Sequence, residues 1–226
     1  MAVTLLKNAK IYDGTGNDAF TGNVLFENDR ILEVGDVDES KADLIYNLEG
    51  KSLSSGFIDE HSPNDWFAIK KDPLPYFEPF LRQGMTTFVT GNCGLSVVGF
   101  EKDSPYSYKV GGGLFGFAGT TGKYSSMKEY AAAADGHMPC NMALLAGHCT
   151  ARTSVAGYEN RKLTPDEEKR MLGQLENALK DGAAGLSLGL MYEPGVYADV
   201  TELRKVAELC AKYDKPLTIH PRAESK

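Results

Sequence analysis

Residues 164–190 read TPDEEKRMLGQLENALKDGAAGLSLGL, a helix followed at once by an apolar strand, and this stretch decides the fold class. Thr164 is a good N-cap, Pro165 suits the first helical position, and Glu167 completes a capping box. Gly182 lies just past the expected end of the helix. The short apolar run that follows is typical of a strand buried in a sheet.

The same alternation extends in both directions from this stretch. A second helix is predicted from about Val200 to Tyr213, with Asp199 and Glu202 as its caps, and an Ala-rich helix from Ser125 to Ala134. Alternating strands and helices are typical of an α/β fold with a parallel sheet, either a barrel or a doubly wound sheet. Apolar runs that end in polar residues predict five strands, at 57–61, 85–90, 141–146, 184–190 and 216–220.

Residues 1–55 have a different pattern, made of short strands and turns. The strand candidates are Val3–Leu6, Val24–Phe26 and Ile31–Gly35, and a turn cluster lies at Asp13–Asp18. We therefore expect a small all-β unit at 1–55. A sheet of this size needs a partner sheet for its apolar face.

Composition and charge exclude several classes of protein. The chain has 226 residues, of which 42% are hydrophobic, and its net charge of −7 argues against a nucleic-acid-binding surface. The first residues carry neither a basic start nor a long apolar stretch, so neither a signal peptide nor a membrane span is predicted. No CxxC motif occurs among the four cysteines, which predicts reduced thiols and a cytoplasmic location.

Side chains suited to metal binding follow several of the predicted strands. His61, Cys93, His148 and His220 each lie at or just past a strand's carboxyl end, where parallel α/β folds gather their chemistry. Taken singly, each has the alternative interpretation of a buried, hydrogen-bonded residue. Imidazole and thiolate together suit a zinc-like ion, and a catalytic zinc needs three protein ligands plus water.

Five ordered motifs resemble the N-acyl-D-amino-acid deacylase (D-aminoacylase) family of the metal-dependent amidohydrolase superfamily. The first resembles the superfamily's first barrel strand, the second a metal-binding cysteine motif, and the third a Gly-His-x-x-x-Arg segment. The last two resemble a fourth-strand signature and His-x-Arg-x-Glu. In chain order they are Gly56–His61, Gly91–Gly94, Gly147–Arg152, Gly185–Pro194 and His220–Glu224.

This resemblance implies a fold and a reaction. The fold would be a small N-terminal β-sandwich part at 1–55, followed at 56–226 by the first five β/α units of a TIM-like barrel. A metal-activated water would hydrolyse the amide bond of an N-acyl-D-amino acid to a carboxylate and a D-amino acid. The partner would be this small molecule, with no nucleic acid and no membrane.

The resemblance also implies roles for single residues. Cys93 and His220 would hold the tightly bound zinc, and His61 would contribute to a second, weaker metal site. Tyr192 would bind the substrate carboxylate, and the motif that contains His148 and Arg152 would complete the substrate site.

The sequence departs from the family pattern in two places. The superfamily's first strand usually ends in His-x-His, whereas this chain reads His61-Ser62-Pro63, and proline cannot ligate a metal. The family also places a histidine on strand six and a catalytic aspartate on strand eight. The chain ends at Lys226, so we expect a truncated barrel whose catalytic aspartate lies beyond residue 226. Such a chain lacks the third family ligand of the tight zinc site, so the resemblance leaves open whether zinc stays bound, and we expect self-association through exposed strand edges.

Two other functions stay open at this point. The chain could be a non-catalytic remnant or interaction module that pairs with another chain. It could also be a cyclic-amide hydrolase of the dihydroorotase or hydantoinase type. The Cys93 motif and the segment around Tyr192 favour the deacylase over the cyclic-amide hydrolase.

Overall fold

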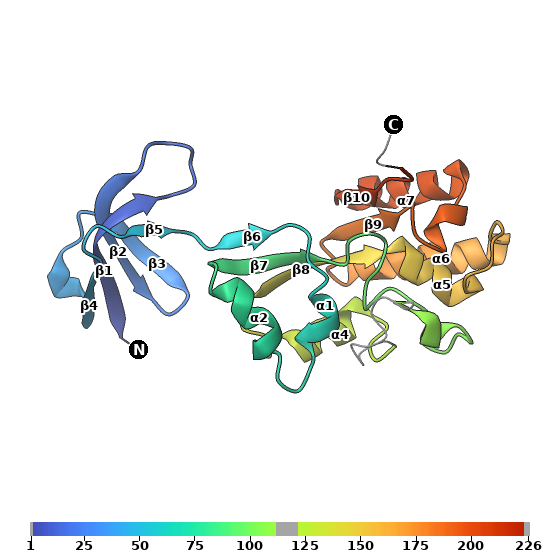
Figure 1. The fold of residues 1–226 in the computed structure, drawn as a ribbon, viewed down its shortest axis with the longest axis horizontal. Coiled ribbons are helices and arrows are strands. Elements are labelled where there is room, and N and C mark those ends of the chain that lie inside the picture. Colours follow the sequence, from blue (N-terminus) through green and yellow to red (C-terminus); the bar gives the residue numbers. More distant parts are fainter. Residues whose placement is uncertain (1, 112–121, 224–226) are drawn as a thin grey trace. The chain divides into compact units, whose positions relative to one another are not determined.

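A computed structural model describes residues 2–111 and 122–223, and its contacts divide the chain into two compact units (Figure 1). The first unit is Met1–Gly56 and the second is Phe57–Lys226. None of the helices within the described ranges is long and apolar enough to cross a membrane.

The first unit is a β-sheet in the order β3-β2-β1-β4, with β5 also pairing with β1. Strands β1, β2 and β3 are antiparallel neighbours, whereas β4 and β5 run parallel to β1. Its elements are β1 (Val3–Tyr12), β2 (Phe20–Glu27), β3 (Arg30–Gly35), the 3-10 turn η1 (Glu39–Lys41), β4 (Leu44–Asn47) and β5 (Ser52–Ser54).

Both faces of this sheet carry a small buried cluster, whereas its outer strands are largely exposed. Leu5 and Leu25 are buried in its small core, because alternate residues of β1 and β2 point to the same side. On the outer strands, Ile31 is 70% exposed and Tyr46 is 55% exposed. The need of this unit for a partner sheet stays a prediction.

The second unit contains the predicted parallel sheet. Its strands follow the order β10-β9-β8-β7-β6, every neighbouring pair is parallel, and the sheet is curled into a half-barrel. All five predicted strands of this unit are confirmed. They are β6 (Phe57–Asp59), β7 (Met85–Thr90), β8 (Asn141–Gly147), β9 (Gly185–Gly189) and β10 (Leu217–His220).

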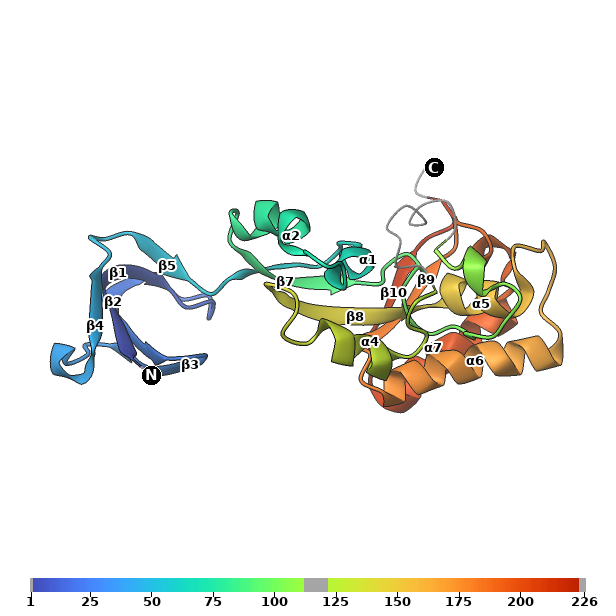
Figure 2. The ribbon, with the colours of Figure 1, turned by 90° about the horizontal axis from the view of Figure 1, so that it is seen from below.

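Helices cover the sheet, and the long helix α6 lies beside α5 and α7 (Figure 2). The capping box between Thr164 and Glu167 is present, and Asp199 caps α7 through the backbone N–H groups of residues 201 and 202, as predicted. The helices are α1 (Asp65–Ala68), α2 (Leu74–Leu81), α4 (Met127–Ala134), α5 (His148–Ala156), α6 (Pro165–Lys180) and α7 (Val200–Tyr213), with 3-10 turns η2 (Ser107–Lys109) and η4 (Gly195–Tyr197).

Two apolar clusters hold these helices on the sheet. Met171 and Leu175 of α6 pack with Leu186 of β9 in one cluster. Trp66 of α1 and Phe77 of α2 pack around β7 in the other. This packing fixes the strands from outside and leaves their carboxyl ends to carry the functional loops.

Candidate functional site

The structure brings together three of the side chains that the sequence singled out as metal ligands. The Sγ atom of Cys93 lies 3.4 Å from Nε2 of His61 and 3.6 Å from Nδ1 of His220. Cys93 follows β7, His61 follows β6, and His220 is the last residue of β10; these parallel strands end at the same edge of the sheet. The thiol of Cys93 is therefore the common neighbour of both imidazoles.

A tight backbone turn points Cys93 towards this edge. Cys93 itself has a positive φ of 58°, and Gly91 before it has a φ of 76°. A Cβ atom on Gly91 would lie 2.0 Å from the carbonyl oxygen of Leu145, and one on Gly189 would lie 1.9 Å from that of Cys93. The Cys93 turn thus rests directly on the backbones of β8 and β9, which only glycine permits at these two positions.

A buried serine on β9 fastens the same turn. The Oγ atom of Ser187 donates a hydrogen bond to the carbonyl of Gly91 and accepts one, at 3.0 Å, from the N–H of Gly94. Ser187 is fully buried, so these bonds are shielded from water. We did not predict this role from the sequence, although a hydroxyl between the apolar Leu186 and Leu188 was a signal for it.

Asn92 connects the neighbouring loops. Its side-chain N–H donates to the carbonyl of Glu60 at 3.2 Å, and its Oδ1 accepts from the hydroxyl of Thr218 at 3.2 Å. Glu60 directly precedes His61, and Thr218 lies two residues before His220. One amide thus ties the strands of both histidines to the Cys93 turn.

The donors fit zinc in chemistry and in spacing. Two ligands on a tetrahedral zinc, at the usual Zn–S and Zn–N bond lengths, lie about 3.6 Å apart. The two distances from Cys93 match this value. Across 2–111 and 122–223, however, no three His, Cys, Asp or Glu side chains are grouped so that they could hold a metal ion. The geometry therefore supports ligand pairs that share Cys93.

Tyr192 lies beside this cluster. Its hydroxyl is 3.4 Å from Nδ1 of His220, and the two rings have centroids 4.7 Å apart. The chain reaches this position through a turn in which the N–H of Tyr192 donates to the carbonyl of Gly189. The phenol is thus placed next to a candidate metal ligand, and its role in substrate binding stays a prediction.

His148 and Arg152 lie in a different environment. Both are fully buried, as the first and fifth residues of α5, and both contact Oε1 of Glu202, His148 through Nε2 at 2.7 Å and Arg152 through Nε at 3.0 Å. Although burial raises the pKa of Glu202, the hydrogen bond from His148 and the charge of Arg152 lower it overall. The prediction that Glu202 helps to cap α7 is wrong, because its carboxylate faces these two side chains instead.

Two further motif residues can be placed. Pro63 follows Ser62, whose N–H donates to the carbonyl of Val89 in the neighbouring strand β7 at 3.1 Å. Arg222 donates to the carbonyls of Val196 and Ala198 at 2.6 Å and so anchors the η4 turn. Glu224 of the same motif lies outside the described residues.

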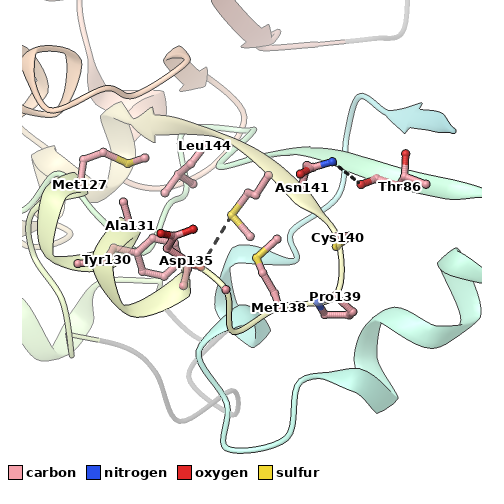
Figure 3. A pocket seen from close by; sticks show the side chains of 14 residues that line it. Thr86, Met127, Tyr130, Ala131, Asp135, Met138, Pro139, Cys140, Asn141 and Leu144 are labelled. Atoms are coloured by element: carbon pink, nitrogen blue, oxygen red, sulfur yellow. Dashed lines mark hydrogen bonds between the residues drawn. The ribbon is translucent and has the colours of Figure 1, made fainter. Parts of the chain in front are cut away.

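A cavity of about 830 Å³ lies at the opposite, amino ends of β7 and β8 (Figure 3). Met138 and Cys140 line it together with α4, and none of the predicted site residues does. Burial raises the pKa of the Cys140 thiol to about 11, so this cysteine is not a ready nucleophile. The cavity is unrelated to the cluster around Cys93.

Comparison with known proteins identifies relatives. No family model matches the chain. N-acyl-D-glutamate deacylase from Alcaligenes xylosoxydans xylosoxydans is 29% identical over 221 residues, which cover 97% of this chain and 44% of the relative. N-acyl-D-glutamate deacylase from Bordetella bronchiseptica, solved with zinc and a phosphonate inhibitor, matches at a TM-score of 0.84 and 29% identity, over 99% of this chain and 46% of that one. A D-aminoacylase with a binuclear metal center matches at a TM-score of 0.83 and 29% identity. The match covers 98% of this chain and 45% of that one.

More distant hydrolases share the fold alone. L-hydantoinase from Arthrobacter aurescens gives a TM-score of 0.54 at 13% identity, which carries no argument for cyclic-amide hydrolysis. The predicted resemblance to the deacylases and the predicted fold class are confirmed. The chain spans less than half the length of the relatives that it matches.

Proposed function

We propose that this relative of the N-acyl-D-amino-acid deacylases uses the edge around Cys93 to hydrolyse the amide bond of N-acyl-D-amino acids. The products would be a carboxylate and a D-amino acid. The observation that carries the proposal is the approach of His61 and His220 to one thiol, at spacings that suit zinc. The relatives named deacylases and aminoacylases supply the substrate class.

The same residues would hold the metal. Cys93 and His220 would bind the tighter zinc, and His61 would contribute to a weaker second site. The binuclear center of D-aminoacylase and the zinc in the Bordetella deacylase support this assignment. When bound, zinc supplies Lewis-acid polarisation of the amide carbonyl and a hydroxide near neutral pH.

The chain's own side chains would bind and orient the substrate. The phenol of Tyr192 can donate a hydrogen bond to the carboxylate of the D-amino acid, because its hydroxyl lies at the same edge as His220. A carboxylate held there would bring the neighbouring amide towards the metal ligands. With the carboxylate and the amide fixed at separate points, the two isomers differ only in where the side chain points, so selectivity for the D isomer would need a third contact, with that side chain.

We assign His148 and Arg152 to a supporting role rather than to direct substrate contact. Both side chains are fully buried, and Glu202 binds Nε2 of His148 and Nε of Arg152. They join α5, which follows β8, to α7, which follows β9. Their contribution to substrate binding would therefore be indirect.

Metal binding by residues 1–226 is the first test. We expect isothermal titration with zinc to give a saturable site that Cys93→Ser and His220→Ala each weaken strongly. Cys140→Ser is the matched control, because that thiol lines the distant cavity. Absence of zinc binding by the unchanged chain would refute the proposal.

Turnover is the second test, measured on protein expressed from the complete reading frame of the gene. We expect zinc-dependent release of the amino acid from N-acetyl-D-glutamate or N-acetyl-D-methionine, and none from the L isomers. Loss of turnover in Tyr192→Phe through a raised KM would support the carboxylate contact. Zinc binding without any turnover would favour the non-catalytic alternative instead.

A further inference from the structure

A buried carboxylate links the two loops that carry His61 and Cys93. Asp65, the first residue of α1, is fully buried. Its Oδ1 accepts a hydrogen bond from the hydroxyl of Thr90, and its Oδ2 accepts one from the N–H of Val97 at 3.1 Å. Its own N–H donates to Oγ1 of Thr90 at 3.2 Å. Three hydrogen bonds therefore join this residue to the Cys93 segment.

These partners bracket Cys93 in the sequence. Thr90 is the last residue of β7 and lies before Cys93, whereas Val97 lies after it. Asp65 itself lies four residues after His61. The carboxylate thus fixes the loop of His61 to both ends of the Cys93 turn.

We propose that Asp65 is a positioning residue that keeps these two loops in register and thereby sets the affinity of the site for zinc. The inference rests on the proposed function, because it assumes that His61 and Cys93 meet in order to bind metal. Their 3.4 Å separation joins two loops, so a shift of either loop changes it directly. A metal bond tolerates only a few tenths of an ångström of such change.

The chemistry of the contacts explains why an aspartate stands here. The N–H of Val97 can only donate, and the hydroxyl of Thr90 already accepts from the N–H of Asp65. Two donors therefore converge on one side chain, and a carboxylate accepts both. The two donors meet different oxygens of Asp65, and an asparagine, with a single acceptor oxygen, would turn its own N–H₂ towards one of them.

Packing from the opposite side holds the carboxylate in place. The hydroxyl of Tyr130 on α4 donates to the backbone carbonyl of Asp65 at 2.7 Å. Trp66, next in the chain, is fully buried in the cluster around β7. Contacts in the core thus hold Asp65 in place. Through its hydrogen bonds, Asp65 can restrict the movement of the loops that carry His61 and Cys93.

The experiment compares zinc affinity in four variants of the chain. Asp65→Asn and Thr90→Val each remove part of the link, Thr90→Ser keeps the hydroxyl, and Leu175→Ala destabilises the separate cluster at α6. We expect Asp65→Asn and Thr90→Val to lose zinc affinity by about 10- to 100-fold, the usual effect of losing a group that orients a metal ligand. Thr90→Ser and Leu175→Ala should bind zinc like the unchanged chain.

Cobalt gives a spectroscopic readout of the same geometry. Co²⁺ bound to a thiolate has a charge-transfer band, which we expect in the unchanged chain and in Thr90→Ser, and weakened in Asp65→Asn. A purely structural role would lower the affinity of Leu175→Ala as much as that of Asp65→Asn, and this result would overturn the inference.

Hydrogen exchange tests the link without metal. We expect Asp65→Asn to speed amide exchange in both 60–66 and 91–97, whereas Leu175→Ala should change neither segment. Unchanged exchange in both segments would refute the inference, and so would faster exchange combined with normal zinc affinity. Failure of the unchanged chain to bind zinc would instead refute the proposed function, and the positioning role with it.

Discussion

Replacement of Ser187 by alanine should both destabilise the second unit and disorder the candidate metal site. The hydroxyl of Ser187 is buried and bonds to Gly91 and Gly94 on either side of Cys93. Its removal leaves one carbonyl and one N–H without this partner inside the protein. Each buried group left unsatisfied costs about 1–3 kcal/mol, so for these two groups we expect a loss of about 2–6 kcal/mol in the free energy of unfolding.

Urea unfolding followed by tryptophan fluorescence measures this loss. Trp66 is the only tryptophan of the chain and lies buried in the second unit, so its emission reports on that unit. In a thermal scan the same loss corresponds to a drop in Tm of roughly 4–24 °C. Zinc affinity should fall as well, because the turn that presents Cys93 loses its fastening.

Ser154→Ala is the matched control. Ser154 is also fully buried, but its hydroxyl donates to the carbonyl of Ala151 within the same helix. We expect this change to cost less than about 1 kcal/mol, because that carbonyl serves the helix already. Equal effects of the two substitutions would show that the Ser187 bonds do not hold the turn.

Three further outcomes are expected. Gly189→Ala should abolish zinc binding and destabilise the chain by more than about 4 kcal/mol, measured by calorimetry and urea unfolding, because its Cβ would collide with the carbonyl of Cys93. Glu202→Gln should cost about 3–5 kcal/mol in urea unfolding at pH 7, since it leaves the buried charge of Arg152 without its carboxylate. Burial raises the pKa of Asp65 to about 6, so its contribution to stability is greatest below pH 4 and is lost as the pH rises through 6. Urea unfolding at several pH values should show this loss, of at most about 3 kcal/mol, and Asp65→Asn should remove it.

The elements of the second unit were predictable because their signals are local. Thr164 and Glu167 cap α6 as their spacing indicates, and the five apolar runs form the five strands. A capping box and a short apolar run depend only on neighbouring residues, so no tertiary information is needed.

Helix α5 and strand β4 were missed for the opposite reason. Helix α5 has the sequence HCTARTSVA, whose Thr, Ser and Val residues favour helix weakly, and it is buried along its whole length. Strand β4 is exposed at every position, and its pairing with β1 links residues far apart in the chain. Both elements depend on tertiary packing, which a local sequence pattern does not predict.

The sequence proposes the members of the candidate site but not the residues that support it. His61, Cys93, His220 and Tyr192 stand at strand ends in motifs that a sequence reveals. The roles of Ser187 and Asp65 depend on hydrogen bonds to partners 93 and 32 residues away. Such bonds follow from the register of the sheet, which only the folded chain supplies.

The contacts of Cys93 also constrain the order in which the molecule can assemble. Its neighbours His61 and His220 lie 32 and 127 residues away along the chain. Closing the longer of these loops costs conformational entropy before any contact at the edge compensates for it. Local segments therefore cannot preform the site, and every strand from β6 to β10 must be paired first. During refolding, we expect tight zinc binding to follow the slowest folding step. The ion would therefore stabilise the native topology after it has formed and would not nucleate folding.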